Sequence, residues 1–446
     1  MNTPICDFVR RYRDSGVSRF HMPGHKGAPL LGCEPLDITE IDGADVLYAP
    51  DGIIAQSEDN ATSLFGTAHS FYATEGSSLA IKAMLALAAQ GKGRAHVLAA
   101  RNAHKAFLYA CALCDISVTW LYPEKGSHLC ACELTARDVE EALCTARESY
   151  DAVYLTSPDY LGHIVDIRAI ASVCHARGVP LLVDNAHGAY LRFLPSSHHP
   201  ISLGADMCCD SAHKTLPVLT GGAYLHIAQR APAAWLSNAR EMLSVFASTS
   251  PSYLILQSLD AANAYLHTAY VEALTSCVKR IEQTKERLEA FGMTVHDSEP
   301  LKLVLSAHTL GYGGQDLSAY LRMNGIEAEY ADRDAVVLMA TPHNTEEDFV
   351  RLERAVHALP HRSPLPTVSA PPLAPLPCRM DLRQALFSQS ETVEVAQALG
   401  RICAQPSVSC PPAIPLAVSG EEITEAAVQC MQYYGITHVR VVLTTT

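Results

Sequence analysis

Residues 181–227 contain an aspartate and a lysine that each follow a short apolar segment, and this arrangement restricts the folds open to the chain. Residues 181–183 (LLV) form an apolar run typical of a buried strand, and Asp184 follows directly. Residues 205–209 predict the next strand, and Lys214 comes shortly after it. In open α/β sheets, ligands bind at the carboxyl ends of the strands. We therefore expect the aspartate and the lysine to act as a pair at that edge.

A lysine and a carboxylate in this order suit a pyridoxal phosphate enzyme. That cofactor needs a lysine that binds its aldehyde covalently and a carboxylate that keeps its pyridine nitrogen protonated. Ser211 and His213 flank Lys214 with hydrogen-bond donors suited to a phosphate. Without this context, Asp184 and Lys214 could equally form an ordinary ion pair, which is the alternative interpretation.

A second candidate for anion binding lies at the start of a helix predicted over residues 77–90. Gly76, Ser77 and Ser78 supply a glycine and two hydroxyls there, and backbone N–H groups and the helix dipole add to the attraction for a phosphate. A plain serine N-cap is the alternative. Glu75 disfavours a phosphate unless its carboxylate points away, because like charges repel.

Two further motifs invite a chemical interpretation. His104 follows a strand predicted over residues 96–100, where an imidazole could stack on a cofactor ring or simply cap a helix. Cys111 and Cys114 have CxxC spacing, with two more cysteines at positions 130 and 132, which is a pattern seen in zinc sites. Because the first pair lies in an apolar helical run, AFLYACALC, we predict no metal site.

Composition excludes several classes of protein. The 446 residues are 48% apolar and 18% charged, which suits a globular chain with two or three cores. No apolar run reaches the length of a membrane span and the start is too polar for a signal peptide, so we expect a cytoplasmic protein without membrane contacts. A formal charge of −14 disfavours nucleic acid as a partner. The 15 cysteines, an odd number in a long chain, predict reduced thiols.

The order of predicted elements gives the domain organisation. Strands and helices alternate up to residue 209, which predicts a largely parallel α/β sheet. A long helix is predicted over residues 255–291, and a later helix opens with a capping box of Asn344 and Glu347. Seven prolines between residues 359 and 377 predict a linker. The expected parts are an N-terminal segment (1–60), a large cofactor-binding domain (61–265), a small α+β domain (266–358), a proline-rich linker (359–377) and a C-terminal domain (378–446).

Several motifs together resemble the Orn/Lys/Arg decarboxylase family: FHMPGHKG, DITEIDGADVLYAPDGII, RNAHKA, DNAHGAY, DSAHKTLPVLTGGAYLH, STSPSYLILQSLD, CPPAIP and SGEEIT. The resemblance covers nearly the whole chain and is closest to the short biosynthetic form without an N-terminal wing domain. It implies an α/β fold in which a large domain of the PLP-dependent transferase-like type (fold type I) has a mostly parallel sheet. Smaller α+β and C-terminal α+β domains complete that fold.

The same resemblance implies a function and an assembly. The reaction would be decarboxylation of a basic amino acid, arginine before lysine or ornithine, to CO₂ and a polyamine or polyamine precursor. The cofactor would be pyridoxal 5'-phosphate. The active site would lie between two protomers, so the chain would form a homodimer or a larger homo-oligomer.

Catalytic roles follow from the resemblance only where residues match its motifs. Lys214 would bind the cofactor aldehyde, and Asp184 would pair with the pyridinium nitrogen. His104 would stack on the ring and His187 would lie close to its edge. His213 would assist in phosphate contact or in protonation.

Phosphate binding is implied for a second set of residues. Gly76, Ser77, Ser78 and Ser211 would hold the phosphate of the same subunit. Thr249 would reach the phosphate of a neighbouring subunit.

The chain departs from the family pattern at four positions. Glu75 stands where Asn is usual, and Asn185 stands where Glu often follows the ring-binding aspartate. Cys410 and Ala413 replace the Tyr and Gly of a YPPGIP-like turn. The last two departures bear on substrate or interface geometry, and so on the substrate more than on the chemistry.

Alternative functions stay open at this point. Another pyridoxal phosphate reaction on the same fold, such as that of an aminotransferase or a β-eliminating lyase, is one alternative, and a non-catalytic paralogue is the other. Retention of both Lys214 and Asp184 disfavours the paralogue. Glu421 and Glu422 are candidates for binding the distal cationic group of the substrate.

Overall fold

The chain forms two compact units in a computed structural model that describes residues 1–122, 133–366, 371, 374–408 and 414–443. The first unit takes in Met1–Leu121, Thr135–Ser157 and Asp166–Tyr270. The second takes in Tyr122–Leu134, Pro158–Val165 and Val271–Thr446. Among the described residues, no helix is both long enough and apolar enough to cross a membrane.

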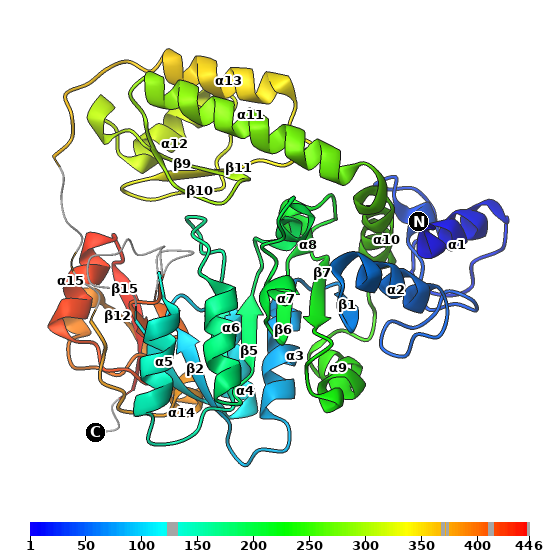
Figure 1. Cartoon of the computed structure of the whole chain (residues 1–446), viewed down its shortest axis with the longest axis horizontal. Coiled ribbons are helices and arrows are strands. Elements are labelled where there is room, and N and C mark those ends of the chain that lie inside the picture. Colours follow the sequence, from blue (N-terminus) through cyan, green and yellow to red (C-terminus); the bar gives the residue numbers. More distant parts are fainter. Residues whose placement is uncertain (123–132, 367–370, 372–373, 409–413, 444–446) are drawn as a thin grey trace. The chain divides into compact units, whose positions relative to one another are not determined.

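A seven-stranded sheet forms the centre of the first unit, in the order β1-β7-β6-β5-β4-β2-β3 (Figure 1). Five neighbouring strands, from β6 to β3 in that order, pair in parallel. Strand β7 pairs antiparallel with both β1 and β6. The strands are β1 (His69–Ala73), β2 (His96–Ala100), β3 (Ser117–Leu121), β4 (Ala152–Thr156), β5 (Leu181–Asp184), β6 (Met207–Asp210) and β7 (Ala223–Ile227).

Helices cover both faces of this sheet because the chain changes direction along it. The connections from β1 to β2 and from β2 to β3 move towards one edge, and the connections from β3 through β6 move back. Right-handed crossovers therefore place the first pair of helices on one face and the next three on the other. Helix α3 (Ser77–Ala89) packs against α4 (Lys105–Cys114), whereas α5 (Ala136–Thr145) packs against α6 (Ile167–Ala176) and α6 against α7 (Pro200–Leu203). The strands between these layers are buried on both faces, which explains their continuous apolar runs.

The remaining helices of the first unit are α1 (Pro4–Asp14), α2 (Ile53–Phe65), α8 (Ala212–Thr215), α9 (Ala233–Phe246) and α10 (Tyr253–Thr268). A buried carboxylate joins three of them. Asp260 of α10 accepts hydrogen bonds from the Ser57 hydroxyl of α2 at 2.6 Å and from the Cys6 backbone N–H of α1 at 2.9 Å. These bonds attach the N-terminal helix to the large unit.

The second unit contains a four-stranded antiparallel sheet, β10-β11-β9-β8, and a C-terminal part with two small sheets. Arg280 of α11 pairs with Glu346 and Glu353 of α13, so these two helices lie side by side. The strands are β8 (Thr294–His296), β9 (Lys302–Ser306), β10 (Tyr330–Ala331), β11 (Val336–Met339), β12 (Ser390–Glu394), β13 (Ser407–Val408), β14 (Ala417–Val418) and β15 (His438–Val442). The helices are α11 (Tyr270–Ala290), α12 (Gly314–Met323), α13 (Glu346–His357), α14 (Leu382–Phe387) and α15 (Glu425–Tyr433).

Two predictions about helices were wrong in detail. The helix expected over residues 255–291 is two helices, α10 and α11, because Tyr270 turns its ring into the core of the first unit, where it packs against Phe193. The capping box of α13 consists of Thr345 and Asp348, one residue beyond the predicted pair. The side chain of Asn344 instead accepts a hydrogen bond from the Thr341 backbone N–H at 2.9 Å.

The strand β7 was missed altogether. Its sequence AYLHI follows a Gly-Gly pair and is too short to show alternation, and only its pairing with β1 and β6 identifies it. The domain boundaries expected from the sequence stay a prediction.

Candidate active site

Asp184 ends β5 and its carboxylate is almost fully buried. It accepts hydrogen bonds from the Ala186 backbone N–H at 3.2 Å and from the Tyr154 hydroxyl at 3.3 Å, and the Cys209 Sγ lies 3.5 Å away. Burial, with the negative charge of Asp184 as the next cause, raises the pKa of Tyr154 and of Cys209 well above their usual ranges. Both groups therefore stay protonated and donate to the carboxylate. Asp184 is oriented by three donors from three segments.

Lys214 lies on the short helix α8, just beyond the end of β6. Its Nζ is 2.9 Å from the Nε2 of His187, a nearly buried residue in the turn after β5. Asp184 and Lys214 follow successive strands, as predicted, and the parallel pairing of β5 with β6 makes these strands neighbours in the sheet. His187, in the turn that follows Asp184, therefore places its imidazole within hydrogen-bonding distance of the Lys214 amine.

His104 caps helix α4, where its Nδ1 accepts a hydrogen bond from the Ala106 backbone N–H at 3.2 Å. Desolvation lowers the pKa of His104, and the positive charges of Lys214 and Lys105 lower it further, whereas Asp184 opposes the shift. His104 thus lies within the electrostatic reach of both the lysine and the aspartate. Its position follows from the topology of the sheet. Strands β2 and β4 are neighbours, but the chain continues from β2 to β3 on one side and from β4 to β5 on the other. Ligands bind where the strand order reverses in this way, and His104 follows β2 at that point.

The start of α3 meets the segment that carries the lysine. The Ser211 hydroxyl donates to Ser77 Oγ at 2.7 Å. Gly76, with φ of 73°, precedes the helix, and its N–H donates to the Gly221 carbonyl at 2.7 Å. A Cβ at Gly221 would lie 2.8 Å from the Thr74 carbonyl oxygen, so this close approach requires glycine.

Glu75, whose charge disfavours a phosphate unless its carboxylate points away, has a hydrogen-bond partner in a distant segment. Its carboxylate accepts a hydrogen bond from the Ser248 backbone N–H at 2.7 Å. The bond ties the loop before α3 to the segment that contains Thr249. Anion binding at Ser77 and Ser78 stays a prediction.

Two predicted site residues have other surroundings. The Nδ1 of His213 donates to the Gly222 carbonyl at 3.0 Å, so this ring supports the turn before β7. Thr249 is exposed. The roles expected for both residues stay predictions, as do those of the other site residues.

The second unit holds the two glutamates that were candidates for the distal substrate group. Glu421 is buried and accepts a hydrogen bond from the Val418 backbone N–H at 2.9 Å. Glu422 pairs with Arg379 at 2.7 Å. Cys410 and Ala413 lie outside the described residues.

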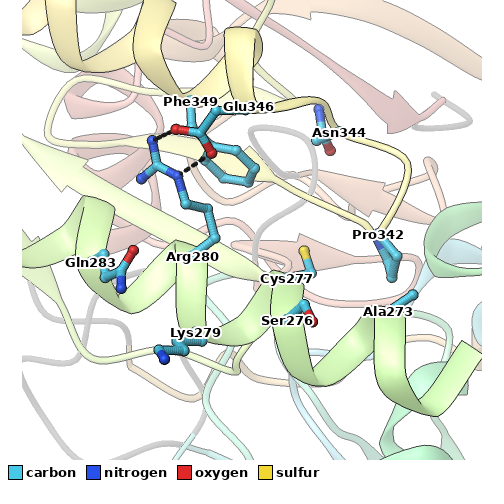
Figure 2. Close-up of a pocket in the computed structure, with 10 residues that line it drawn as sticks. All are labelled: Ala273, Ser276, Cys277, Lys279, Arg280, Gln283, Pro342, Asn344, Glu346 and Phe349. Atoms are coloured by element: carbon cyan, nitrogen blue, oxygen red, sulfur yellow. Dashed lines mark hydrogen bonds and ion pairs between the residues drawn. The ribbon is translucent and has the colours of Figure 1, made fainter.

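Figure 2 shows residues that line a surface pocket in the second unit, between α11 and the start of α13. The volume of this pocket is about 460 Å³. Arg280 binds Glu346 through two hydrogen bonds of 2.8 Å each, so the charges at the pocket are largely paired. None of the residues predicted for the active site lines it. The lining residues are Ala273, Ser276, Cys277, Lys279, Arg280, Gln283, Pro342, Asn344, Glu346 and Phe349.

Metal binding has a different candidate from the one considered in the sequence. Cys111 and Cys114 both lie on α4, and the two later cysteines of that pattern are outside the described residues. Within the described part of the chain, the group with ligand atoms close enough for a metal ion is His199, Cys208 and Asp210. The Asp210 carboxylate there already accepts a hydrogen bond from His199 at 3.0 Å.

Sequence reasoning missed Tyr154 and Cys209 beside Asp184. Both are polar or weakly polar side chains inside apolar strands, AVYLT and MCCD. A polar group in a strand buried on both faces needs a partner, and this is the signal that could have found them. The partner itself depends on strand order, which the sequence does not give.

A buried aspartate at the end of one strand, a lysine after the next, and a helix N-terminus with two serines define a class of protein. The class is that of the fold type I pyridoxal phosphate enzymes. The constitutive lysine decarboxylase of E. coli has the same fold, with a TM-score of 0.80 at 17% identity over 99% of this chain and 82% of that one.

Sequence comparison then gives the family. The chain matches the Orn/Lys/Arg decarboxylase major domain over residues 3–306 and the C-terminal domain of that family over residues 377–439. It belongs to the Orn/Lys/Arg decarboxylase family, and pyridoxal phosphate is its cofactor. It is 30% identical to the arginine decarboxylase of Bacillus subtilis, over 95% of this chain and 91% of the relative. It is 29% identical to the arginine decarboxylase of Halalkalibacterium halodurans, again over 95% and 91%.

Proposed function

We propose that the protein decarboxylates arginine, with lysine and ornithine as poorer substrates, and releases CO₂ and the corresponding amine. The observation that carries the proposal is the pairing of Lys214 with His187 beside Asp184, in a chain whose relatives include arginine decarboxylases at about 30% identity. The amine product would be a polyamine or its precursor.

The residues present fit the cofactor. When bound, pyridoxal phosphate accepts electron density from the substrate Cα as the carboxylate leaves. In our proposal, Asp184 holds the proton on the pyridine nitrogen, and its three donors keep it in place. Lys214 supplies the amine that binds the aldehyde. Ser77, Ser78 and Ser211, with the backbone N–H groups at the start of α3, hold the phosphate.

Proton transfer is assigned to the pair of Lys214 and His187. Their nitrogens are 2.9 Å apart, which is hydrogen-bonding distance, so the imidazole can hold or return the proton that the amine uses at Cα. His104 is assigned to stacking on the ring, because it lies near both Asp184 and Lys214. His213 would act through the turn at Gly222, which it already supports.

We also assign a second copy of the chain as the partner. The segment between α1 and α2 exposes large apolar side chains: Phe20 is 96% exposed, Leu30 is 85% and Leu31 is 90%. The Glu34 carboxylate accepts the backbone N–H groups of residues 30–32 at 2.6–2.9 Å, which fixes how these leucines are presented. Apolar surface of this kind is typical of interfaces. A homodimer that covers this segment and uses Thr249 across the interface, in the cytoplasm, is the proposed form.

The test is to incubate the cofactor-loaded protein with arginine, lysine and ornithine separately, and to follow CO₂ and the amine. Rapid release from arginine supports the proposal. A lysine-bound cofactor band without CO₂ from any of the three would contradict it and favour another reaction. Lys214→Ala is expected to lose cofactor that borohydride can fix to the protein; covalent fixation in that variant would mean that another lysine is used.

A further inference from the structure

Asp210, the residue before Ser211, lies in a fully buried cluster that the proposed chemistry does not use. Its carboxylate accepts hydrogen bonds from Asn185 Nδ2 at 2.6 Å, from His199 Nε2 at 3.0 Å and from His226 Nε2 at 3.2 Å. All four side chains have no exposed surface. Burial alone would raise the pKa of Asp210, but the two histidines outweigh it and hold that pKa well below its usual range. The cluster therefore contains one carboxylate anion with three donors.

The bond between Asp210 and Asn185 joins the two segments that carry the candidate catalytic groups. Asn185 directly follows Asp184 and stands two residues before His187. Asp210 stands four residues before Lys214. The Asn185 backbone N–H donates to the Cys209 carbonyl at 3.0 Å, just past the last paired residues Asp184 and Cys209, and the side-chain bond to Asp210 adds a second link between the two segments.

The amide of Asn185 is held from its other side as well. A Cβ at Gly188 would collide with Asn185 Oδ1, so the amide oxygen fills the inside of the turn. The Gly188 N–H donates to the Asn185 carbonyl at 2.8 Å and closes that turn. His187 lies within that turn, and its Nε2 is 2.9 Å from Lys214 Nζ.

We propose that Asp210 is a positioning residue that acts through Asn185 to hold His187 against Lys214, and that positions 185 and 210 function as one acid–amide pair. The inference rests on the proposed role of Lys214. The proposed pair also explains why this chain has Asn at position 185, where the family often has Glu after the ring-binding aspartate. A carboxylate at position 185 would face the buried carboxylate of Asp210 at hydrogen-bonding distance.

The pattern of hydrogen-bond donors and acceptors suggests a test in which the amide and the carboxylate are exchanged between positions 185 and 210. Asn185→Asp creates two facing carboxylates. Asp210→Asn must turn its amide N–H₂ either towards Asn185 or towards the histidines, and each choice sets donor against donor. The double variant N185D/D210N keeps all three hydrogen bonds, because the amide at position 210 donates to the new carboxylate while its oxygen accepts from both histidines.

Matched controls are available in the same unit. Asn263 is also fully buried, and its Nδ2 donates to the Ser57 carbonyl at 3.0 Å and to the Tyr72 hydroxyl at 2.7 Å. Asp260 is likewise fully buried and accepts from Ser57. Asn263→Asp and Asp260→Asn impose the same chemical changes at a buried site that does not join the two catalytic segments.

The readout is the absorbance of the lysine-bound cofactor across pH, with the rate of borohydride fixation measured beside it. The pH midpoint is the pH at which half of the change in this absorbance has occurred. We expect each single variant at position 185 or 210 to shift this midpoint by at least half a pH unit and to slow borohydride fixation at least fivefold. The double variant should return both to within twofold of the original protein. The controls should lower thermal stability and leave the pH midpoint unchanged.

Three results would overturn the inference: single variants with an unchanged midpoint, a double variant as impaired as the singles, or controls that shift the midpoint equally. If Asn185→Asp does not fold, Asn185→Ala takes its place, with the same expected shift, because it removes the donor without adding a charge. Since these readouts need no turnover, a protein that binds cofactor but releases no CO₂ would contradict the proposed function alone.

Discussion

Replacement of His187 by alanine tests the proposed proton transfer most directly. The imidazole is 2.9 Å from Lys214 Nζ and only 6% exposed, so water cannot readily take its place. A hydrogen bond that involves a charged group contributes about 1.5–3 kcal/mol. At about 1.36 kcal/mol per factor of ten, the loss corresponds to a decrease in kcat of roughly 10- to 150-fold.

The assay is the initial rate of amine formation from arginine, with kcat and KM determined separately. The decrease should fall on kcat, because His187 contacts the lysine rather than the phosphate region. Cofactor content, measured after borohydride fixation, should stay near that of the original protein. His175→Ala removes another histidine, one hydrogen-bonded to Asp206 at 2.9 Å, and should leave kcat unchanged. A decrease in kcat of less than threefold for His187→Ala would refute the assignment.

Three further predictions concern the framework. Gly188→Ala should lower the free energy of unfolding by about 1–3 kcal/mol in urea denaturation, because the new methyl group collides with Asn185; equal stability would show that the turn adapts. Glu58→Gln should cost about 1–3 kcal/mol in the same assay, because it removes the counter-charge of Arg240, which lies 2.6 Å from that buried carboxylate but is itself partly exposed; a cost below about 0.5 kcal/mol would contradict this. Backbone N–H donors lower the pKa of Glu34 to about 2, so its stabilising contribution should be complete above the unfolded-state pKa of about 4.3 and be lost as the pH falls towards 2. Denaturation between pH 5 and pH 2.5 should show a flatter profile for Glu34→Gln, and parallel profiles would argue against the effect.

Much of the large unit could be predicted because its strands are buried on both faces. LLV before Asp184 shows this directly, since a continuous apolar run leaves few alternatives to a central strand. Lys214 was placed in the same way, because it follows the next apolar run, which was predicted as a strand over residues 205–209. Helix α3 was also predicted, over residues 77–90, although its N-cap is Gly76 without a side-chain cap hydrogen bond and it is buried on nearly all sides rather than on one face.

The partners of these residues could not be predicted, because they depend on which strands become neighbours. Tyr154 reaches Asp184 only because β4 pairs with β5, and Asp210 reaches Asn185 only because β5 pairs with β6. His213 shows the same limit, since its position beside the lysine in the sequence does not reveal which group its ring contacts. Its ring in fact donates to Gly222, a contact set by the return of the chain into β7.

The reversed strand β7 has a consequence for how the protein is made. Strand β1 pairs with β7, whose first residue comes 150 positions after the last residue of β1 (223 minus 73). At a synthesis rate of about 5–20 residues per second, β1 waits roughly 8 to 30 s on the ribosome for that neighbour. Until then β1 lacks its neighbour in the sheet, and α3, the helix that follows it, lacks part of the surface on which it packs, because it contacts β7 as well as β6. The segment with Lys214 emerges just before β7, so in the proposed site the entry of this strand would complete the phosphate-binding residues and the lysine segment together. We therefore expect a nascent chain to retain the cofactor only after β7 has entered the sheet.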